Sequence, residues 1–189
     1  TKNNSKVKEL WNGLEEYSYT SSRGVYYVMR VGQPVGEFRI SAPETVKDKN
    51  SPYYGATVVN SNGFPNQSAT DYEYLGKAEA DFTMGFTTNL RWKNLSFSAT
   101  ADWRKGGLMY SETSYISHFN GNSTQTVYNE RNSFIYPNSV KLVGGEYVEN
   151  NIMVKANQMN YAVGNYSYNQ MIRREFVLPK DYFKLREVS

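Results

Sequence analysis

Side chains that could perform covalent chemistry are scarce in this sequence of 189 residues. The absence of cysteine excludes a thiol nucleophile, a thiolate metal site and a disulfide framework. His118 is the only histidine, and no pair of carboxylates stands near it in the sequence. No motif indicates a Ser-His-Asp site, so we interpret His118 as a solvated loop residue. We therefore predict no catalytic residue, no metal site, no cofactor and no enzymatic activity.

Tyrosine gives the sequence its main potential for binding, because it joins a flat apolar ring to a hydroxyl group. Such rings stack on sugars or form partner surfaces. The tyrosines of interest lie in the polar stretch after residue 105: Tyr110, Tyr115, Tyr128, Tyr136, Tyr161, Tyr166 and Tyr168. The candidates for contact with a substrate are Tyr110, Tyr115, Arg131 and Asn132. The alternative is that the tyrosines form interfacial belts and pack the loops against one another.

Composition narrows the class of protein further. The net charge is only +3 and the basic residues are scattered, so we predict no nucleic-acid partner. No run of 18 apolar residues occurs, which excludes a transmembrane helix but not a membrane β-barrel, whose strands alternate. Abundant Tyr, Asn, Ser, Thr and Gly indicate a β-rich protein with long polar loops.

Residues 81–104 carry the clearest structural pattern. Apolar and polar side chains alternate with a period of two, which predicts a β-hairpin with two different faces. The apolar face comprises Phe82, Met84, Phe86, Thr88, Leu90, Trp92, Leu95, Phe97, Ala99, Ala101 and Trp103. A two-residue turn at Lys93–Asn94 keeps these residues on one side of the sheet, and Asn94 suits the positive φ of a tight turn. The predicted cross-strand pairs are Trp92 with Leu95, Leu90 with Phe97, Phe86 with Ala101 and Met84 with Trp103.

The length of the hairpin is its most informative property. Each arm has roughly 10–12 residues, about twice the usual strand length. At about 3.3 Å per residue and a tilt near 45°, such an arm covers roughly the 25 Å apolar band of an outer-membrane barrel. Phe82, Trp92 and Trp103 stand near the ends of the apolar face, where aromatic girdles form in such barrels. The alternative is a soluble β-sandwich in which a second sheet covers the same face.

The rest of the chain has weaker signals. Residues 1–22 favour an extended or turn-rich segment, although some apolar residues recur at helical spacing. We expect strands over 24–31 and 181–189, and short extended pieces over 37–41 and 56–59. We expect irregular chain over 42–79, where Pro43, Pro52 and Pro65 argue against a long central strand. Residues 108–117 alternate like a strand, and 118–180 is a long polar stretch.

Several segments, in this order, match a known family: 31–38 (VGQPVGEF), 74–76 (YLG), 82–86 (FTMGF), 90–97 (LRWKNLSF), 102–110 (DWRKGGLMY), 130–132 (ERN) and 182–189 (YFKLREVS). Together they resemble the SusC/RagA family of TonB-linked outer-membrane transporters. From Arg39 onward the sequence departs from the family's usual continuation, and residues 1–30 match it poorly.

The resemblance implies an all-β fold: a segment of a large antiparallel transmembrane β-barrel with long extracellular loops. Residues 1–189 would be part of the barrel domain, and the plug domain and TonB box would lie upstream of them. Residues 81–104 would be a membrane-spanning hairpin whose turn faces the periplasm. The loops at 42–79 and 105–180 would face outside, since long outer loops and short periplasmic turns are the rule in such barrels.

In this arrangement the hairpin residues divide by environment. The lipid-facing residues would be Phe86, Leu90, Phe97 and Ala99, with Phe82, Trp92 and Trp103 at the interfaces. The lumen-facing residues would be Thr87, Asn89, Ser98, Thr100, Asp102 and Arg104, unless the last two are held in a salt bridge within the wall.

The resemblance also implies a location in the bacterial outer membrane and a function in transport. The protein would import an oligomeric nutrient, a glycan or a peptide. A SusD-like surface lipoprotein would capture the substrate, and the TonB complex would supply the energy through the absent upstream region. The alternative function is that of a soluble or surface-attached β-sandwich that binds carbohydrate, and a secreted glycosidase ranks third because no acid pair is identifiable.

Overall fold

The computed structural model describes residues 2, 4–154 and 173–189. These residues are predominantly β-strand and contain one α-helix. The strands are β1 (Glu16–Ser22), β2 (Val25–Arg30), β3 (Glu37–Pro43), β4 (Thr57–Val59), β5 (Gln67–Lys77), β6 (Phe82–Trp92), β7 (Leu95–Lys105), β8 (Leu108–Tyr110), β9 (Phe134–Ile135), β10 (Ser139–Val143), β11 (Glu146–Glu149), β12 (Met153–Val154), β13 (Val177–Pro179) and β14 (Tyr182–Val188). The helices are α1 (Glu112–Phe119) and the 3-10 helices η1 (Trp11–Gly13), η2 (Thr124–Arg131) and η3 (Arg173–Phe176). The strands form five open sheets, none of which closes into a barrel.

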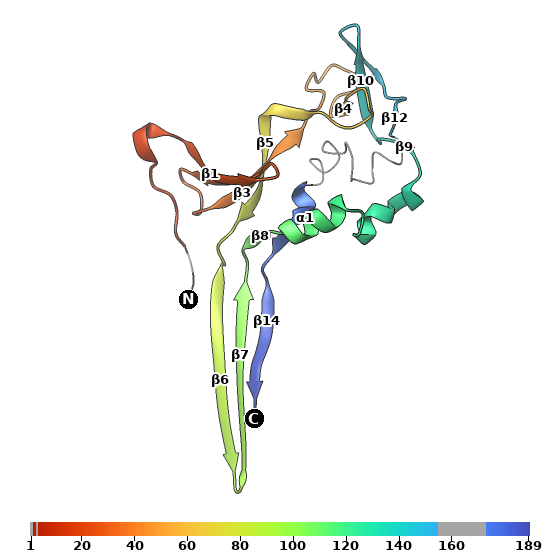
Figure 1. The fold of residues 1–189 in the computed structure, drawn as a ribbon. Coiled ribbons are helices and arrows are strands. Elements are labelled where there is room, and N and C mark those ends of the chain that lie inside the picture. Colours follow the sequence, from red (N-terminus) through yellow and green to blue (C-terminus); the bar gives the residue numbers. More distant parts are fainter. Residues whose placement is uncertain (1, 3, 155–172) are drawn as a thin grey trace.

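Strands β6, β7 and β14 form a three-stranded antiparallel sheet, ordered β14-β7-β6, that projects away from the rest of the molecule (Figure 1). The predicted hairpin register is confirmed, because Trp92 pairs with Leu95 and Leu90 pairs with Phe97. The predicted strand at 181–189 is also confirmed, as β14, which pairs with β7. The expectation for the turn was wrong in one respect: the positive φ of 50° belongs to Lys93, and Asn94 has none.

A four-stranded antiparallel sheet, ordered β1-β2-β3-β5, lies above the projecting sheet (Figure 1). The predicted strands at 24–31 and 37–41 are present as β2 and β3, and the extended N-terminal segment as β1. Val25, Val28 and Ile40 are buried in this sheet. The expectation of irregular chain over 42–79 is wrong for its second half, because β5 is 11 residues long. The expectation that this stretch has no long central strand is confirmed, because β5 is an edge strand of the sheet. The prolines of this stretch all precede β5, so they limit only the chain before it.

A small mixed sheet, ordered β11-β10-β4, lies at the top of the molecule (Figure 1). Its core consists of Val46, Ala56, Val58 and Val140, all buried. The parallel pairing of β4 with β10 joins residues about 80 positions apart in the sequence, Val58 with Val140. The short extended piece expected at 56–59 is confirmed as β4. This packing gives the polar stretch after residue 118 a folded structure of its own.

Helix α1 overturns two expectations. The alternating pattern at 108–117 predicted a strand, but the strand ends at Tyr110 and the helix begins at Glu112. The side-chain oxygen of Ser111 accepts a hydrogen bond from the backbone N–H of Ser114 (3.2 Å), which is the N-cap arrangement that starts a helix. His118 is 1% exposed, so the expectation of a solvated loop histidine was wrong. Its ring packs against Phe176 with 5.7 Å between ring centroids.

Three short bends join the projecting sheet to the structure above it: residues 78–81, 106–107 and 180–181. At the second bend, Gly106 and Gly107 both have positive φ. The carboxylate of Asp181, at the third bend, accepts hydrogen bonds from the backbone N–H of Gly106 and from the Lys105 ammonium, both at 2.5 Å. These two bonds lower the pKa of the Asp181 carboxyl, the ammonium bond being the larger effect. The bends are therefore held together by charged and polar contacts.

Candidate functional site

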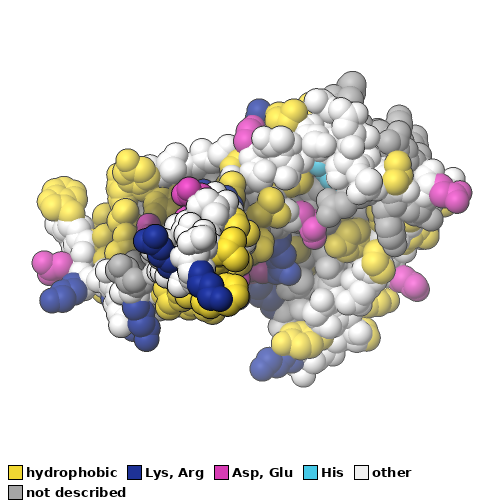
Figure 2. All heavy atoms as spheres, turned by 90° about the horizontal axis from the view of Figure 1, so that it is seen from below, with side chains coloured by type: hydrophobic (Ala, Val, Ile, Leu, Met, Phe, Trp, Pro, Cys, Tyr) yellow, Lys and Arg dark blue, Asp and Glu magenta, His cyan; other side chains and the backbone are white. Residues whose placement is uncertain are grey.

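The outstanding surface of the molecule is the apolar face of the β14-β7-β6 sheet. Its large side chains are exposed in all three strands: Met84, Phe86, Leu90, Trp92, Leu95, Phe97, Trp103, Phe183, Leu185 and Val188. The register places them on one side, since Phe183 lies opposite Trp103 and Leu185 lies opposite Ala101. Figure 2, which views the molecule from the tip of this sheet, shows hydrophobic side chains at the surface around its near end. Soluble monomers rarely expose a continuous apolar surface of this extent.

Aromatic and charged residues mark both ends of this face. At the upper end the rings of Phe82 and Trp103 meet edge to face, with centroids 4.9 Å apart. Directly above them stand the charged residues of the bends, including Lys105 and Asp181. At the tip, the Lys93 ammonium lies 5.0 Å from the centre of the Trp92 ring. The apolar band therefore has defined boundaries.

The opposite face of the same sheet is polar and hydrogen-bonded across the strands. The hydroxyl groups of Thr87 and Thr100 are 3.5 Å apart, and those of Ser98 and Ser189 are 2.7 Å apart. The guanidinium of Arg186 donates to the Asp102 carboxylate at 2.6 Å. Asp102 therefore lies in a salt bridge within the sheet, which was one of the two alternatives for it. The division of Phe86, Leu90, Phe97 and Ala99 from Thr87, Asn89, Ser98, Thr100, Asp102 and Arg104 by face is confirmed.

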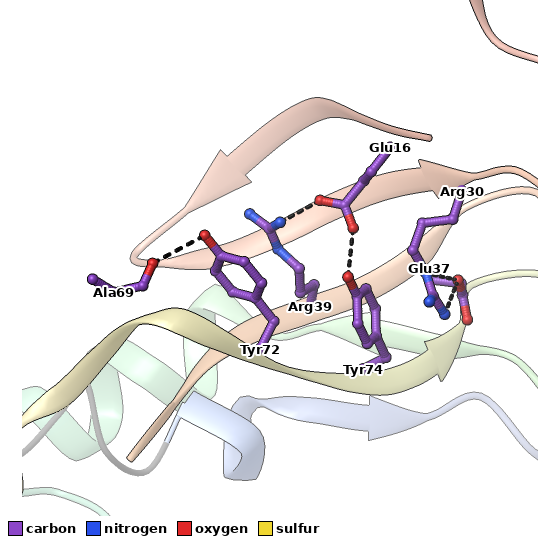
Figure 3. Close-up of polar contacts among 7 residues, drawn as sticks. All are labelled: Glu16, Arg30, Glu37, Arg39, Ala69, Tyr72 and Tyr74. Carbon is purple, nitrogen blue, oxygen red and sulfur yellow. Dashed lines mark hydrogen bonds and ion pairs between the residues drawn. The ribbon is translucent and has the colours of Figure 1, made fainter. Parts of the chain in front are cut away.

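A second polar cluster lies on the four-stranded sheet (Figure 3). Arg39 forms an ion pair with Glu16. The Tyr74 hydroxyl donates to the same carboxylate at 2.7 Å, and burial, together with this bond, raises the pKa of Tyr74. The Arg39 guanidinium also lies over the Tyr72 ring, 4.0 Å from its centre. These contacts satisfy a charge whose side chain is only 12% exposed.

Sequence reasoning missed this cluster. Glu16 and Tyr74 are 58 positions apart, and no spacing pattern joins them. The neighbouring ion pair of Arg30 with Glu37 (2.9 Å) is more local, because β2 and β3 are consecutive strands. Arg30 also stacks on Tyr74, with 3.5 Å from the guanidinium to the ring centre. The alternation of acidic residues with Tyr in β5, residues 71–74 (DYEY), is the one pattern from which the cluster could have been found.

The structure brings two of the four predicted substrate-binding residues together. Tyr110 and Tyr115 flank Glu112, whose carboxylate accepts hydrogen bonds from Ser22 (3.2 Å) and Arg23 (3.3 Å). Burial raises the pKa of Tyr110, and the neighbouring Glu112 carboxylate adds to this shift. Tyr115 is 3% exposed and packs against Phe176, so its ring is not accessible to a substrate in this structure. It packs the loops together, as the alternative interpretation held.

The other predicted binding residues lie elsewhere or are not described. Asn132 is exposed after η2, and Arg131 ends η2, but its side chain is outside the described part of the structure. The side chain of Tyr128 and the whole of Tyr161, Tyr166 and Tyr168 also lie outside the described residues. The substrate-binding role of Tyr110, Arg131 and Asn132 therefore stays a prediction.

Within residues 2, 4–154 and 173–189, no three His, Asp or Glu side chains gather as a metal site would require. In the same residues no helix has the length and hydrophobicity to span a membrane. No protein-family model matches the chain, and no curated protein matches it.

Proposed function

We propose that β6, β7 and β14 form part of the wall of a membrane β-barrel in the bacterial outer membrane. The observation that carries the proposal is the exposed apolar face of this sheet. Leu90 is 62% exposed although it sits in a regular strand with every backbone partner in register. In water such a face favours association, whereas lipid solvates it. The three strands then need no covering sheet.

The dimensions of the face support the same proposal. β6 and β7 have 11 residues each, which span about 25 Å when tilted by about 45°. Aromatic residues at both ends, with charges beyond them, are typical of the interfacial girdles of membrane barrels. Phe82, Trp92 and Trp103 would occupy these interfaces, and Phe86, Leu90, Phe97 and Ala99 would contact lipid.

The topology also supports a barrel wall. Strands β6, β7 and β14 are antiparallel neighbours, as in an up-and-down barrel. The second edge of β6 is approached by the N-terminal segment, because Lys2 forms an antiparallel bridge with Phe82. Edge pairing of this kind is what closes membrane barrels, since lipid offers no hydrogen bonds to an open edge.

Within this framework we propose TonB-dependent import of an oligomeric nutrient, a glycan or a peptide, as the activity. The support is the resemblance of the seven segments between residues 31 and 189 to SusC/RagA transporters. A SusD-like lipoprotein would help to capture the substrate outside. The TonB complex would then drive a rearrangement of the plug that admits the substrate. The folded loops above the wall, including Tyr110 and Asn132, would face outside. Thr87, Asn89, Ser98 and Thr100 would face the lumen, and no covalent step is involved.

A carbohydrate-binding β-sandwich is less well supported. It needs a second sheet over Phe86 and Leu90, and no described element of the chain covers them. The exposed tyrosines of the four-stranded sheet would still allow sugar stacking. The two functions therefore differ in the environment of the projecting sheet.

The test is a pair of arginine substitutions at adjacent positions of β6. Phe86→Arg places a charge in the middle of the apolar face and should destabilise the folded protein by about 2–4 kcal/mol in lipid vesicles. Thr87→Arg is the matched control, because Thr87 lies on the polar face, and it should change stability by less than about 0.5 kcal/mol. Urea-induced unfolding of the intact protein from phospholipid vesicles measures both values.

Two outcomes would contradict the membrane proposal. One is equal stability of the two variants, since a charge at Phe86 would then meet no apolar environment. The other is recovery of the intact native protein in the aqueous fraction without detergent. A large loss from Phe86→Arg in water alone would instead indicate the dry core of a sandwich.

A further inference from the structure

A loop beside the four-stranded sheet forms one side of an open cavity. Residues 8–14 form this loop between Val7 and Glu15, and β1 begins directly after it at Glu16. Backbone hydrogen bonds hold the two ends of the loop together. The N–H of Val7 donates to the carbonyl of Gln33 (3.0 Å), the N–H of Gly32 to the carbonyl of Val7 (2.8 Å) and the N–H of Val31 to the carbonyl of Glu15 (3.0 Å). This is the geometry of an Ω-loop, a class of surface loops that frequently carries function. None of the residues that line the cavity belongs to β6, β7 or β14.

The interior of this loop is open, and its largest side chain, Trp11, does not line it. An Ω-loop is usually filled by its own side chains. Here the space between the loop, Arg30 and Tyr74 is a cavity of about 660 Å³, within the size range of binding sites for small ligands and side chains. Trp11, at the turn formed with Asn12, is 84% exposed. An exposed tryptophan beside a cavity is typical of a contact with a partner.

The chemistry of the lining indicates the kind of ligand. Leu10, Leu14 and Val31 form apolar walls. The charged groups at the base are already paired, Arg30 with Glu37 and Glu16 with Arg39.

Three further charges line the cavity: Lys8, Glu9 and Glu15. Among the described residues none of the three has an ion pair. Two carboxylates against one ammonium leave a net charge of −1, which favours a cationic group, and the apolar walls favour an apolar group next to it.

We propose that this cavity binds a basic peptide segment, with a lysine or arginine side chain between Glu9 and Glu15 and an apolar neighbour against Leu14 and Val31. Trp11 lies in the sequence between the lining residues Leu10 and Gly13, and it contacts the bound segment at the rim. A neutral saccharide could stack on the Tyr74 ring and donate hydrogen bonds from its hydroxyl groups to the carboxylates. It would gain no electrostatic attraction from the excess negative charge. The site is independent of the membrane wall and of the import activity proposed above.

The experiment uses two capped tripeptides as probes, acetyl-Leu-Arg-Leu-amide and acetyl-Leu-Glu-Leu-amide, titrated into the intact protein by calorimetry at low ionic strength. The arginine probe should bind, and the glutamate probe should bind at least about tenfold more weakly. Glu9→Gln and Glu15→Gln should each lower the affinity for the arginine probe about two- to fivefold. Lys8→Gln should raise this affinity by a similar factor, an effect that a purely structural role of the loop would not produce.

Controls separate binding from folding. Glu146→Gln removes an exposed carboxylate in β11, which does not line the cavity, and should leave probe binding unchanged. Trp11→Ala should weaken the arginine probe at least about tenfold, with an unchanged thermal midpoint because the side chain is almost fully exposed. Equal binding of both tripeptides, or tighter binding of maltotriose than of the arginine probe, would overturn the proposal. So would unchanged binding in Glu9→Gln and Glu15→Gln.

Discussion

The two large antiparallel sheets of this protein use their side chains in opposite ways. In the β1-β2-β3-β5 sheet the charged side chain of Arg39 is almost fully buried, and Val28 is completely covered. In the β14-β7-β6 sheet the large apolar side chains are exposed, and the charged pair Asp102–Arg186 lies on the other, polar face. Both sheets are antiparallel and both contain register shifts, so the difference is not one of backbone structure.

The comparison shows which environment each sheet is suited to. The four-stranded sheet satisfies its buried charges with its own residues, as a protein in water must. In the three-stranded sheet, backbone groups and polar side chains find partners between the strands, but no other part of the described chain covers the apolar face. A membrane strand has the same requirement, because lipid covers apolar side chains but offers nothing to an unpaired backbone group.

The largest effect is expected in the four-stranded sheet. Arg39→Ala leaves the Glu16 carboxylate, itself only 22% exposed, without its cation and removes the stacking on Tyr72. Loss of one partner from a mostly buried pair should cost about 3 kcal/mol. Arg91→Ala, on the polar face of β6, is the control and should cost less than about 0.5 kcal/mol. Urea unfolding in one detergent buffer gives both values, and equal losses would remove the distinction between the sheets.

An intermediate effect is expected where the two sheets meet. Gly107 has φ +87°, and a Cβ atom there would lie 2.7 Å from the backbone oxygen of Ala78, next to the end of β5. Gly107→Ala should therefore destabilise the protein by about 2–3 kcal/mol. Gly144→Ala is the matched control, because Gly144 also has positive φ but nothing lies within 4 Å of its Cβ position.

The control should cost only about 1 kcal/mol, from the backbone conformation alone. Thermal unfolding of both variants measures the difference. If Gly107→Ala is no worse than Gly144→Ala, the close approach between the bends is not needed to hold the sheets together.

The smallest effect is expected from the charged contact above the apolar band. Hydrogen bonds from Lys105 and Gly106 hold the pKa of Asp181 below its usual value. A carboxyl with a lowered pKa stabilises the fold above its unfolded pKa, and this contribution disappears as the pH falls through the folded value. Asp181→Asn should thus lower the thermal midpoint slightly at pH 6, with no difference from the unaltered protein near pH 2. A constant difference between about pH 6 and pH 2 would contradict the role of this charge.

Much of the projecting sheet could be predicted from the sequence. The alternation in residues 81–104 gave the two faces, and the two-residue turn gave the pairing of Leu90 with Phe97. These features are local, because the period of a strand and the length of a turn are set within a few residues. The same reasoning failed at 108–117, where alternation predicted a strand but the Ser111 cap begins a helix. A capping residue and a few alternating side chains are weak signals of similar strength over so short a segment.

The sequence by itself determined the β-rich class, the hairpin register and the division of the hairpin into an apolar and a polar face. Only the tertiary structure decided that His118 is buried, that Glu16 contacts Arg39 and Tyr74, and that residues 8–14 border an open cavity. The physical reason is the distance along the chain over which each feature is encoded. Strand alternation repeats every second residue, whereas a buried ion pair or cavity depends on strands that meet only when the whole sheet has formed.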